Sequence, residues 1–417
     1  MPTVSRRGLL GSGVAAAGVA GAFAAGRVTG EEDATAGAPS SYPFRGERQA
    51  GIVTPAQDRL HFAALDVTTD DRAELVDLLQ RWTDAAERMT QGRPAGPVGP
   101  TQGSIYAPPD DTGEAIGLPP SRLTITFGFG PSLFVDEHGR DRFGIADRKP
   151  AALEPLPHFS ADMLEPARTG GDLCIQACAD DPQVAVHAVR NLVRMGFGTT
   201  AVRWSQLGFG RTSTTSTSQD TPRNLFGFKD GTANIKAEDA ALLDDHVWVA
   251  DGDDPKADWL VGGSYVVTRR INQTIEVWDR QPLGDQQDFI GRTKDTGAPL
   301  SGGSELTEPD FGVQGSDGPI IPRDAHVRVV HPEYNDGLRI LRRGYNFVDG
   351  TDAIGGLDAG LFFIAYLRDP RTHFIPLQRT MAAHDALMEY LRFTGQAVFA
   401  VPPGTAAGEH VGQALFA

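Results

Sequence analysis

The sequence predicts an α+β protein made of two ferredoxin-like halves, in which helices pack on antiparallel sheets. Residues 61–209 read as strand, helix, strand, strand, helix, strand, which is the split β-α-β order of a ferredoxin-like unit. A Ser/Thr-rich run at residues 212–218 ends this stretch, and strands and helices alternate again after it. We therefore expect an N-terminal half over residues 47–215 and a C-terminal half over residues 220–417.

Composition and charge narrow the class of protein. The chain has 417 residues, 40% hydrophobic and 22% charged, which is typical of a globular protein with one large or two ordinary domains. Its 54 acidic and 38 basic residues give a formal net charge of −16. This charge disfavours nucleic acid and anionic membrane surfaces as partners.

The N-terminus has the pattern of an export signal. Arg6 and Arg7 precede a mildly apolar run of Ala, Gly and Val that ends near Ala25, with small residues beyond it. Paired arginines indicate the Tat pathway, so residues 1–36 are predicted to be a Tat signal peptide and the start of a flexible tether. We expect a periplasmic, cell-envelope or extracellular protein with no integral membrane span after processing.

The first half alternates strands with two helices. Residues 61–67 are rich in apolar types and are predicted to form a strand. Asp70 or Asp71 caps a helix over residues 73–89, because apolar side chains recur there at helical spacing. The remaining predictions for this half are a Gly/Pro-rich loop at 91–120, strands at 123–129 and 173–178, a helix that opens at Asp181 and runs to Val193, and extended structure at 204–209.

The chain has two cysteines, and both lie in the strand predicted at residues 173–178. A spacing of four places Cys174 and Cys178 on one face, two pleats apart, which is too far for a relaxed disulfide. Two cysteines without an adjacent histidine do not complete a zinc site. We predict free, buried thiols that pack as small hydrophobic groups.

The second half repeats the mixture of strands and helices. Residues 264–270, Ser-Tyr-Val-Val-Thr-Arg-Arg, are predicted to form a strand. Residues 282–322 are rich in loop-forming types. The other predictions are helices at 237–243, 271–279 and 380–391, and strands at 327–330, 338–341 and 361–366.

The second half opens with Leu-Phe-Gly-Phe-Lys-Asp-Gly-Thr-Ala-Asn, residues 225–234. Glycine lets a backbone turn tightly and approach a bulky ligand. Two phenylalanines, Phe226 and Phe228, precede Asp230, so we expect this acid in a pocket of low polarity. Burial of that kind raises the pKa of a carboxylate, which suits it for proton transfer. Taken alone, the motif is equally typical of an Asp-Gly turn.

Two more motifs follow about a hundred residues later. His326 lies in Pro-Arg-Asp-Ala-His-Val-Arg, before a predicted strand, and Arg342 and Arg343 lie in Leu-Arg-Arg-Gly-Tyr-Asn-Phe. The G-x-x-D-G loop, this histidine and an arginine sixteen residues after it resemble the dye-decolourising peroxidase family of haem enzymes. Within that family the chain is similar to the exported deferrochelatase/peroxidase branch. The resemblance covers nearly all of the chain after the leader.

The resemblance implies one haem b in the C-terminal half. It makes His326 the proximal ligand of the iron through Nε2, with an acceptor on Nδ1 that Asp385 or Glu389 could provide. It places Arg342 on the distal side, where a fixed cation stabilises negative charge on peroxide oxygen. It also makes Asp230 the distal group that accepts a proton from peroxide and returns it.

The resemblance implies a set of haem contacts around these residues: Gly231, Thr232, Ala233, His326, His331, Arg342 and Phe363. Ala233 is accommodated if its φ angle is negative. One of Phe362 and Phe363 is expected to cover the distal pocket, while the other packs in the core. Arg343 alternates with Arg342 along a strand, so we expect it to face away, toward an acidic partner.

The predicted function is that of a haem b peroxidase. Hydrogen peroxide would oxidise dyes, phenols or similar small aromatic reductants through a ferryl intermediate. The alternative is deferrochelatase-like haem binding and iron release, with iron-uptake permease components as partners, or a subunit that only docks with such a permease. The pair Asp230 and Arg342 favours the peroxidase, because a haem carrier needs only the ligand. The physiological reductant and the formation of a homo-oligomer stay open at this point.

Overall fold

The first half folds as strand, helix, strand, strand, helix, strand in the computed structural model, which describes residues 40–417. The elements are β1 (Arg59–Val67), α1 (Arg72–Thr90), β2 (Thr124–Phe129), α2 (Pro131–Phe134), β3 (Leu173–Ala179), α3 (Pro182–Met195) and β4 (Thr200–Arg211). The strands pair antiparallel in the order β4-β1-β3-β2. The predicted ferredoxin-like order is therefore confirmed for this half. The predicted signal peptide at residues 1–36 lies outside the described residues.

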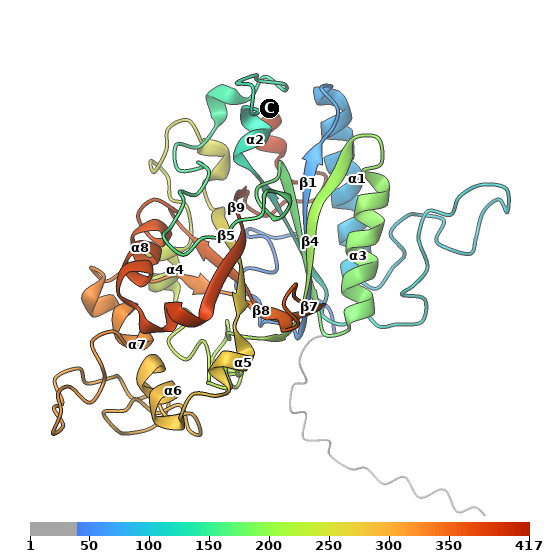
Figure 1. Cartoon of the computed structure of the whole chain (residues 1–417). Coiled ribbons are helices and arrows are strands. Elements are labelled where there is room, and N and C mark those ends of the chain that lie inside the picture. The colour runs from blue at the N-terminus through green and yellow to red at the C-terminus, as the bar shows by residue number, and fades with distance from the viewer. Residues whose placement is uncertain (1–39) are drawn as a thin grey trace, which may run out of the picture. The chain divides into compact units, whose positions relative to one another are not determined.

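The two long helices of this half begin at aspartates. The side chain of Asp71 accepts hydrogen bonds from the backbone N–H groups of Ala73 and Glu74, and Asp181 does the same for Gln183. α1 and α3 lie side by side on one face of the sheet (Figure 1). No helix in residues 40–417 is both long and apolar enough to cross a membrane.

The second half repeats this arrangement with different connections. Its elements are α4 (Ala240–His246), β5 (Ser264–Gln273), α5 (Ile275–Trp278), α6 (Leu283–Ile290), α7 (His326–Val329), β6 (Leu341–Arg342), β7 (Tyr345–Thr351), β8 (Leu357–Leu367), α8 (Phe374–His384) and β9 (Leu391–Val401). The strands pair antiparallel in the order β9-β5-β8, and both β6 and β7 pair with the far side of β8. β6 and β7 thus act as one interrupted edge strand.

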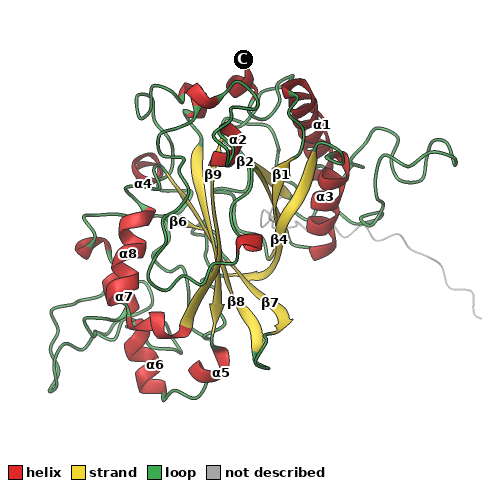
Figure 2. Cartoon of the chain, turned by 45° about the horizontal axis from the view of Figure 1, so that its top comes forward, coloured by secondary structure: helices red, strands yellow, loops and turns green. Residues whose placement is uncertain are grey.

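The two sheets join at both edges. Phe129 of β2 pairs with Ala400 of β9, and β4 pairs with β7 where Phe209 meets Asn346. Figure 2 shows the strands running through the middle, with α1 and α3 on one side and α7 and α8 on the other. Apolar side chains of both sheets pack between them, and the rings of Phe62 and Phe362 lie 5.4 Å apart.

Cys174 and Cys178 lie in this inner layer as buried free thiols, as the sequence predicted. They come from β3, and their neighbours are aromatic and aliphatic side chains of both halves. The layer therefore uses them as small hydrophobic groups.

Four predicted elements differ from the structure. In the helix predicted at 271–279, residues 271–273 belong to β5, and only Ile275–Trp278 form the helix α5. The strand predicted at 327–330 is part of the helix α7, in which Val329 N–H donates to Ala325 O at 3.0 Å. The strand predicted at 338–341 is loop until Leu341. The helix predicted at 380–391 starts earlier, at Phe374, and gives way to a 3-10 turn at Ala386–Tyr390. Short apolar runs do not separate strand from helix, because four residues satisfy either period.

Candidate functional site

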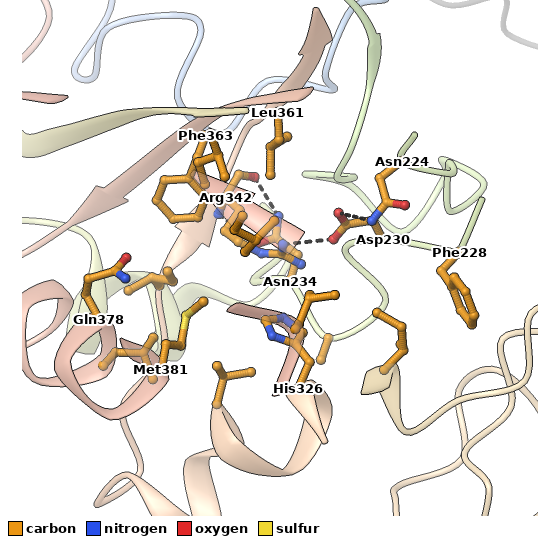
Figure 3. A pocket seen from close by; sticks show the side chains of 18 of the residues that line it. Asn224, Phe228, Asp230, Asn234, His326, Arg342, Leu361, Phe363, Gln378 and Met381 are labelled. Atoms are coloured by element: carbon orange, nitrogen blue, oxygen red, sulfur yellow. Dashed lines mark hydrogen bonds and ion pairs between the residues drawn. The ribbon is translucent and has the colours of Figure 1, made fainter. Parts of the chain in front are cut away.

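A large cavity lies in the C-terminal half, bounded by the 224–234 loop, α7, α8 and the inner strands (Figure 3). It holds about 1350 Å³ of space not filled by atoms, counting its open mouth. Most of its wall is apolar: Phe228, Ile271, Ile290, Leu361, Phe363, Phe374, Leu377, Met381, Leu387, Leu391 and Phe393 all contribute. An apolar wall with a few convergent polar groups suits a bulky, mostly apolar ligand.

His326 provides an imidazole on one wall of this cavity. Its Nδ1 lies 2.6 Å from Oδ2 of Asp385, whose side chain is fully buried. Burial lowers the pKa of His326, but the charge and hydrogen bond of Asp385 raise it, and the net shift of this pKa is upward. The bond to Nδ1 orients the ring and leaves Nε2 available for a ligand. Of the two acceptors considered, the structure selects Asp385.

Asp230 and Arg342 form an ion pair in the same cavity. Arg342 Nη1 donates to Asp230 Oδ1 at 2.8 Å, and the two side chains are 26% and 13% exposed. Figure 3 shows Arg342 and Asp230 above His326 in this view. The three residues on which the sequence prediction depends therefore meet in one cavity, although α7 and β6 are separate elements.

Two asparagines that the sequence analysis did not single out hold this pair in place. Asn224 Nδ2 donates to Asp230 Oδ2 at 3.1 Å. Asn234 Oδ1 accepts the backbone N–H of Arg342 at 2.7 Å, and its Nδ2 donates to the Arg342 carbonyl at 2.9 Å. Both asparagines flank the acidic loop, so their position in the motif was the only signal in the sequence.

The acidic loop turns where its second glycine lies. Gly231 has φ +89°, and a Cβ atom there would lie 2.6 Å from the Cα of Ser213. The next two residues diverge: Ala233 lines the cavity, whereas the hydroxyl of Thr232 donates to Glu305 at 3.3 Å. The prediction that Ala233 is accommodated required a φ angle that is not positive, and the structure meets this requirement. Gly231 and Thr232 were expected to contact the haem, but neither lines the cavity.

His331 and Arg343 have different surroundings from those expected. The Nε2 of His331 lies 2.8 Å from Glu308, and this residue is absent from the cavity wall, which its neighbour Pro332 does line. Arg343 faces away from the cavity and is fully buried, but its partner is not an acid. It donates to the Thr54 carbonyl at 2.5 Å and to the Gln57 side chain. The expected acidic partner is therefore wrong.

Phe363 lines the cavity, and Phe362 packs between the two sheets. Adjacent residues of a strand point to opposite faces, so β8 provides one ring to each environment. The prediction of one ring in the pocket and one in the core is confirmed, and the structure assigns Phe363 to the pocket.

The residues of the cavity fit a haem group. A free imidazole nitrogen suits iron, apolar walls suit a macrocycle, and Arg339 places a cation among the lining residues where acidic substituents can pair. Gln273 Oε1 and Gln378 Nε2 belong to residues of the wall and have no hydrogen-bond partner among the described residues. Buried polar atoms normally have a hydrogen-bond partner, so these two indicate a partner that the protein itself does not provide.

Comparison with known families matches both halves of the chain. Residues 49–210 match the family described as Dyp-type peroxidase, N-terminal, and residues 221–406 match Dyp-type peroxidase, C-terminal. Together these matches cover most of the chain. They include His326, Asp230 and Arg342 in the second region.

Curated relatives and solved structures resemble the chain over nearly their full lengths. The deferrochelatase of Escherichia coli K12 is 38% identical over 379 residues, 89% of this chain and 86% of that protein. The dye-decolorizing peroxidase of Thermobifida fusca is 39% identical over 377 residues, 88% of this chain and 83% of that protein. The crystal structure of a DyP-type peroxidase from Streptomyces coelicolor has 40% identity and a TM-score of 0.81, covering 90% of this chain and 97% of that chain.

Proposed function

Because this chain belongs to the Dyp-type peroxidase family, we propose that His326, Asp230 and Arg342 carry its reaction in the cavity of the C-terminal half. The chain is a haem peroxidase, which uses hydrogen peroxide and a reductant. One observation supports the assignment most: a single cavity brings together an imidazole held by Asp385 and an acid–arginine pair.

His326 would hold the haem through Nε2. When bound, haem supplies iron that exchanges electrons with peroxide and reductant. The Asp385 carboxylate keeps the proton of the ring on Nδ1, so Nε2 presents its lone pair to the cavity. A carboxylate also strengthens the imidazole as a donor, because it stabilises positive charge on the ring.

Asp230 would move the proton of hydrogen peroxide. Each of its oxygens accepts one hydrogen bond, Oδ1 from Arg342 and Oδ2 from Asn224, so lone pairs remain for a proton from the inner peroxide oxygen. Asp230 then returns this proton to the outer oxygen, which leaves as water. The guanidinium of Arg342 stabilises the negative charge that develops on the peroxide during this transfer.

The apolar wall restricts water in this reaction. Phe363 from β8 and Phe374 from α8 lie 6.0 Å apart, ring centroid to ring centroid, and both line the cavity. Exclusion of water strengthens the electrostatic interactions of Arg342 and protects reactive species from side reactions.

A second function is deferrochelatase-like release of iron from haem. The similarity to the deferrochelatase of Escherichia coli, at 38% identity, motivates it. We favour the peroxidase for this chain because the acid–arginine pair has a role in peroxide chemistry and none in haem carriage. Iron-uptake permease components and a second copy of the chain are proposed partners, and dyes or phenols are the proposed reductants.

Export through the Tat pathway is part of this proposal. The twin arginines and the apolar run that follows them support it. Tat export carries folded proteins, which suits a protein loaded with its cofactor before transport. Replacement of Arg6 and Arg7 by lysine should retain the protein in the cytoplasm, and fractionation of cells measures this. Unchanged export of the double-lysine variant would contradict the assignment.

One haem-loaded preparation separates the two functions. We expect peroxide-dependent oxidation of a phenol or an anthraquinone dye, measured by absorbance, with no metal-free porphyrin in the extract. Accumulation of metal-free porphyrin without peroxide consumption would instead support iron release. Asp317 is an exposed acid in the 315–318 turn, so Asp317→Asn is a control variant that should behave like the unmodified protein.

A further inference from the structure

A second cavity lies beside the N-terminus of α8, separate from the large one. It holds about 700 Å³ of space not filled by atoms, counting its mouth, and its wall includes Thr372 and His373. The next residue, Phe374, lines the large cavity. The residues that line the two cavities therefore adjoin in sequence where α8 begins, and the peroxidase reaction does not explain the role of the second cavity.

The wall of this cavity carries six ionisable residues of the Asp and Arg types: Asp245, Asp253, Asp254, Asp369, Arg368 and Arg371. Both arginines are already paired. Arg368 Nη2 lies 2.6 Å from Asp253, and Arg371 Nη2 lies 2.7 Å from Asp369. Each arginine therefore neutralises one aspartate, Asp253 or Asp369, and no positive charge of these arginines is left over.

Asp245 and Asp254 have no cationic partner among the described residues. Asp254 accepts hydrogen bonds from two backbone N–H groups, those of Ala151 and Lys256, which orient its carboxylate but do not neutralise it. Burial lowers the pKa of His373, so this imidazole does not contribute a positive charge at neutral pH. The cavity therefore has an excess of two negative charges.

Tyr265 adds a phenol hydroxyl to the same wall. The residue is only 3% exposed and lines the cavity, and its Oη takes part in no hydrogen bond among the described residues. Burial raises the pKa of this phenol, and the charges of Asp369 and Asp254 raise it further, so the hydroxyl stays neutral. Its lone pairs and its proton are therefore available to a ligand in the cavity.

We propose that this cavity binds a small organic ammonium ion. A primary ammonium group has three N–H donors, which match the carboxylates of Asp254 and Asp245 and the lone pairs of Tyr265 Oη. Ala152 and Val249 provide an apolar surface for the carbon skeleton. A metal ion is a poorer match, because residues 40–417 contain no group of three or more His, Cys, Asp or Glu placed to hold one.

Isothermal titration of the haem-loaded chain with benzylammonium tests this proposal, and benzyl alcohol is a probe of the same shape without the charge. We expect benzylammonium to bind and benzyl alcohol not to. Tyr265→Phe removes only the hydroxyl and should weaken binding about tenfold, as expected for a hydrogen bond to a charged group. Asp254→Asn removes one charge and should weaken it at least as much, whereas Asp317→Asn should change nothing.

Equal affinities for the two probes would overturn the proposal, as would an unchanged affinity in both Tyr265→Phe and Asp254→Asn. Displacement of benzylammonium by equimolar Mn²⁺ would also overturn it, in favour of a metal site. Circular dichroism and the unfolding midpoint verify that each variant is folded. Asp254 lies on a partly exposed loop, so its variant decides the question if Tyr265→Phe does not fold.

Discussion

At the scale of single residues, the orientation of Asn224 is what fixes the carboxylate of Asp230. The Oδ1 of Asn224 accepts the backbone N–H of Phe226 at 3.1 Å, so its Nδ2 must face Asp230. The amide therefore acts only as a donor toward the acid. This hydrogen bond holds the carboxylate in a fixed orientation within the cavity.

We predict that Asn224→Leu lowers the second-order rate with peroxide by about tenfold, because the carboxylate of Asp230 loses the donor that orients it. Asn224→Asp should lower the rate at least as much, since its carboxylate cannot donate a hydrogen bond and repels Asp230. Stopped-flow absorbance of the haem-loaded proteins measures the rate. Equal rates for all three proteins would refute the role of Asn224.

Residue types could be predicted from the sequence more readily than their partners. Asp230, His326 and Arg342 could be predicted because their motifs resemble those of a known family. The choice of Asp385 over Glu389 could not, because it depends on where α8 ends and the following turn begins. The prediction of an acidic partner for Arg343 was wrong for a similar reason. The backbone carbonyl that accepts its hydrogen bond belongs to Thr54, which is far from Arg343 in the sequence.

At the scale of elements, the acidic loop depends on a close approach to the segment that contains Ser213. Gly231→Ala should reduce the free energy of unfolding by about 2–4 kcal/mol, because it adds both a positive-φ strain and a contact with the Ser213 backbone. Gly252 has φ +83° and open space around it, so Gly252→Ala should cost only about 1 kcal/mol. Urea unfolding compares the two variants. Equal losses would mean that the close approach contributes nothing.

The helix α7 differs from the predicted strand, yet it still brings His326 to the cavity. Residues 327–330 are apolar enough for a strand, but no neighbouring strand pairs with them among the described residues. The run instead closes one helical turn between two prolines, Pro322 and Pro332. His326 lies at the first position of this turn and lines the cavity, so its placement there does not depend on the strand that was predicted.

At the scale of the whole molecule, two repeated halves share one inner layer. The fold of each half could be predicted from the order of its strands and helices, because the sequence patterns that indicate these elements are local. The edge pairings of Phe129 with Ala400 and of Phe209 with Asn346 could not be predicted, because each joins residues far apart in the chain. These pairings make the stability of one half depend on the other.

Acid should destabilise the molecule partly through His61 of β1. Burial lowers the pKa of His61 to about 4 from an ordinary value of 6.5. Between these values the unfolded chain binds a proton that the folded chain does not, so stability falls as the pH falls from 6.5 to 4. The loss is about 3 kcal/mol at most.

Replacement of this histidine by a residue that does not titrate isolates its contribution. We expect His61→Gln to lose less free energy of unfolding between pH 6.5 and 4.5 than the unmodified protein does. Urea unfolding of the haem-loaded proteins at the two pH values measures the difference. Identical losses would show that His61 takes no part in acid destabilisation.

The most direct measurement is stopped-flow absorbance of the haem-loaded protein after mixing with one equivalent of hydrogen peroxide. The comparison uses the unmodified chain, Asp230→Asn, Arg342→Leu and the control Asp317→Asn. We predict a fast change in the haem spectrum for the unmodified chain and the control, and a rate at least about a hundredfold lower for one or both of the cavity variants, as removal of a general base or an electrostatic stabiliser produces. Equal rates in all four proteins would contradict the assignment of Asp230 and Arg342.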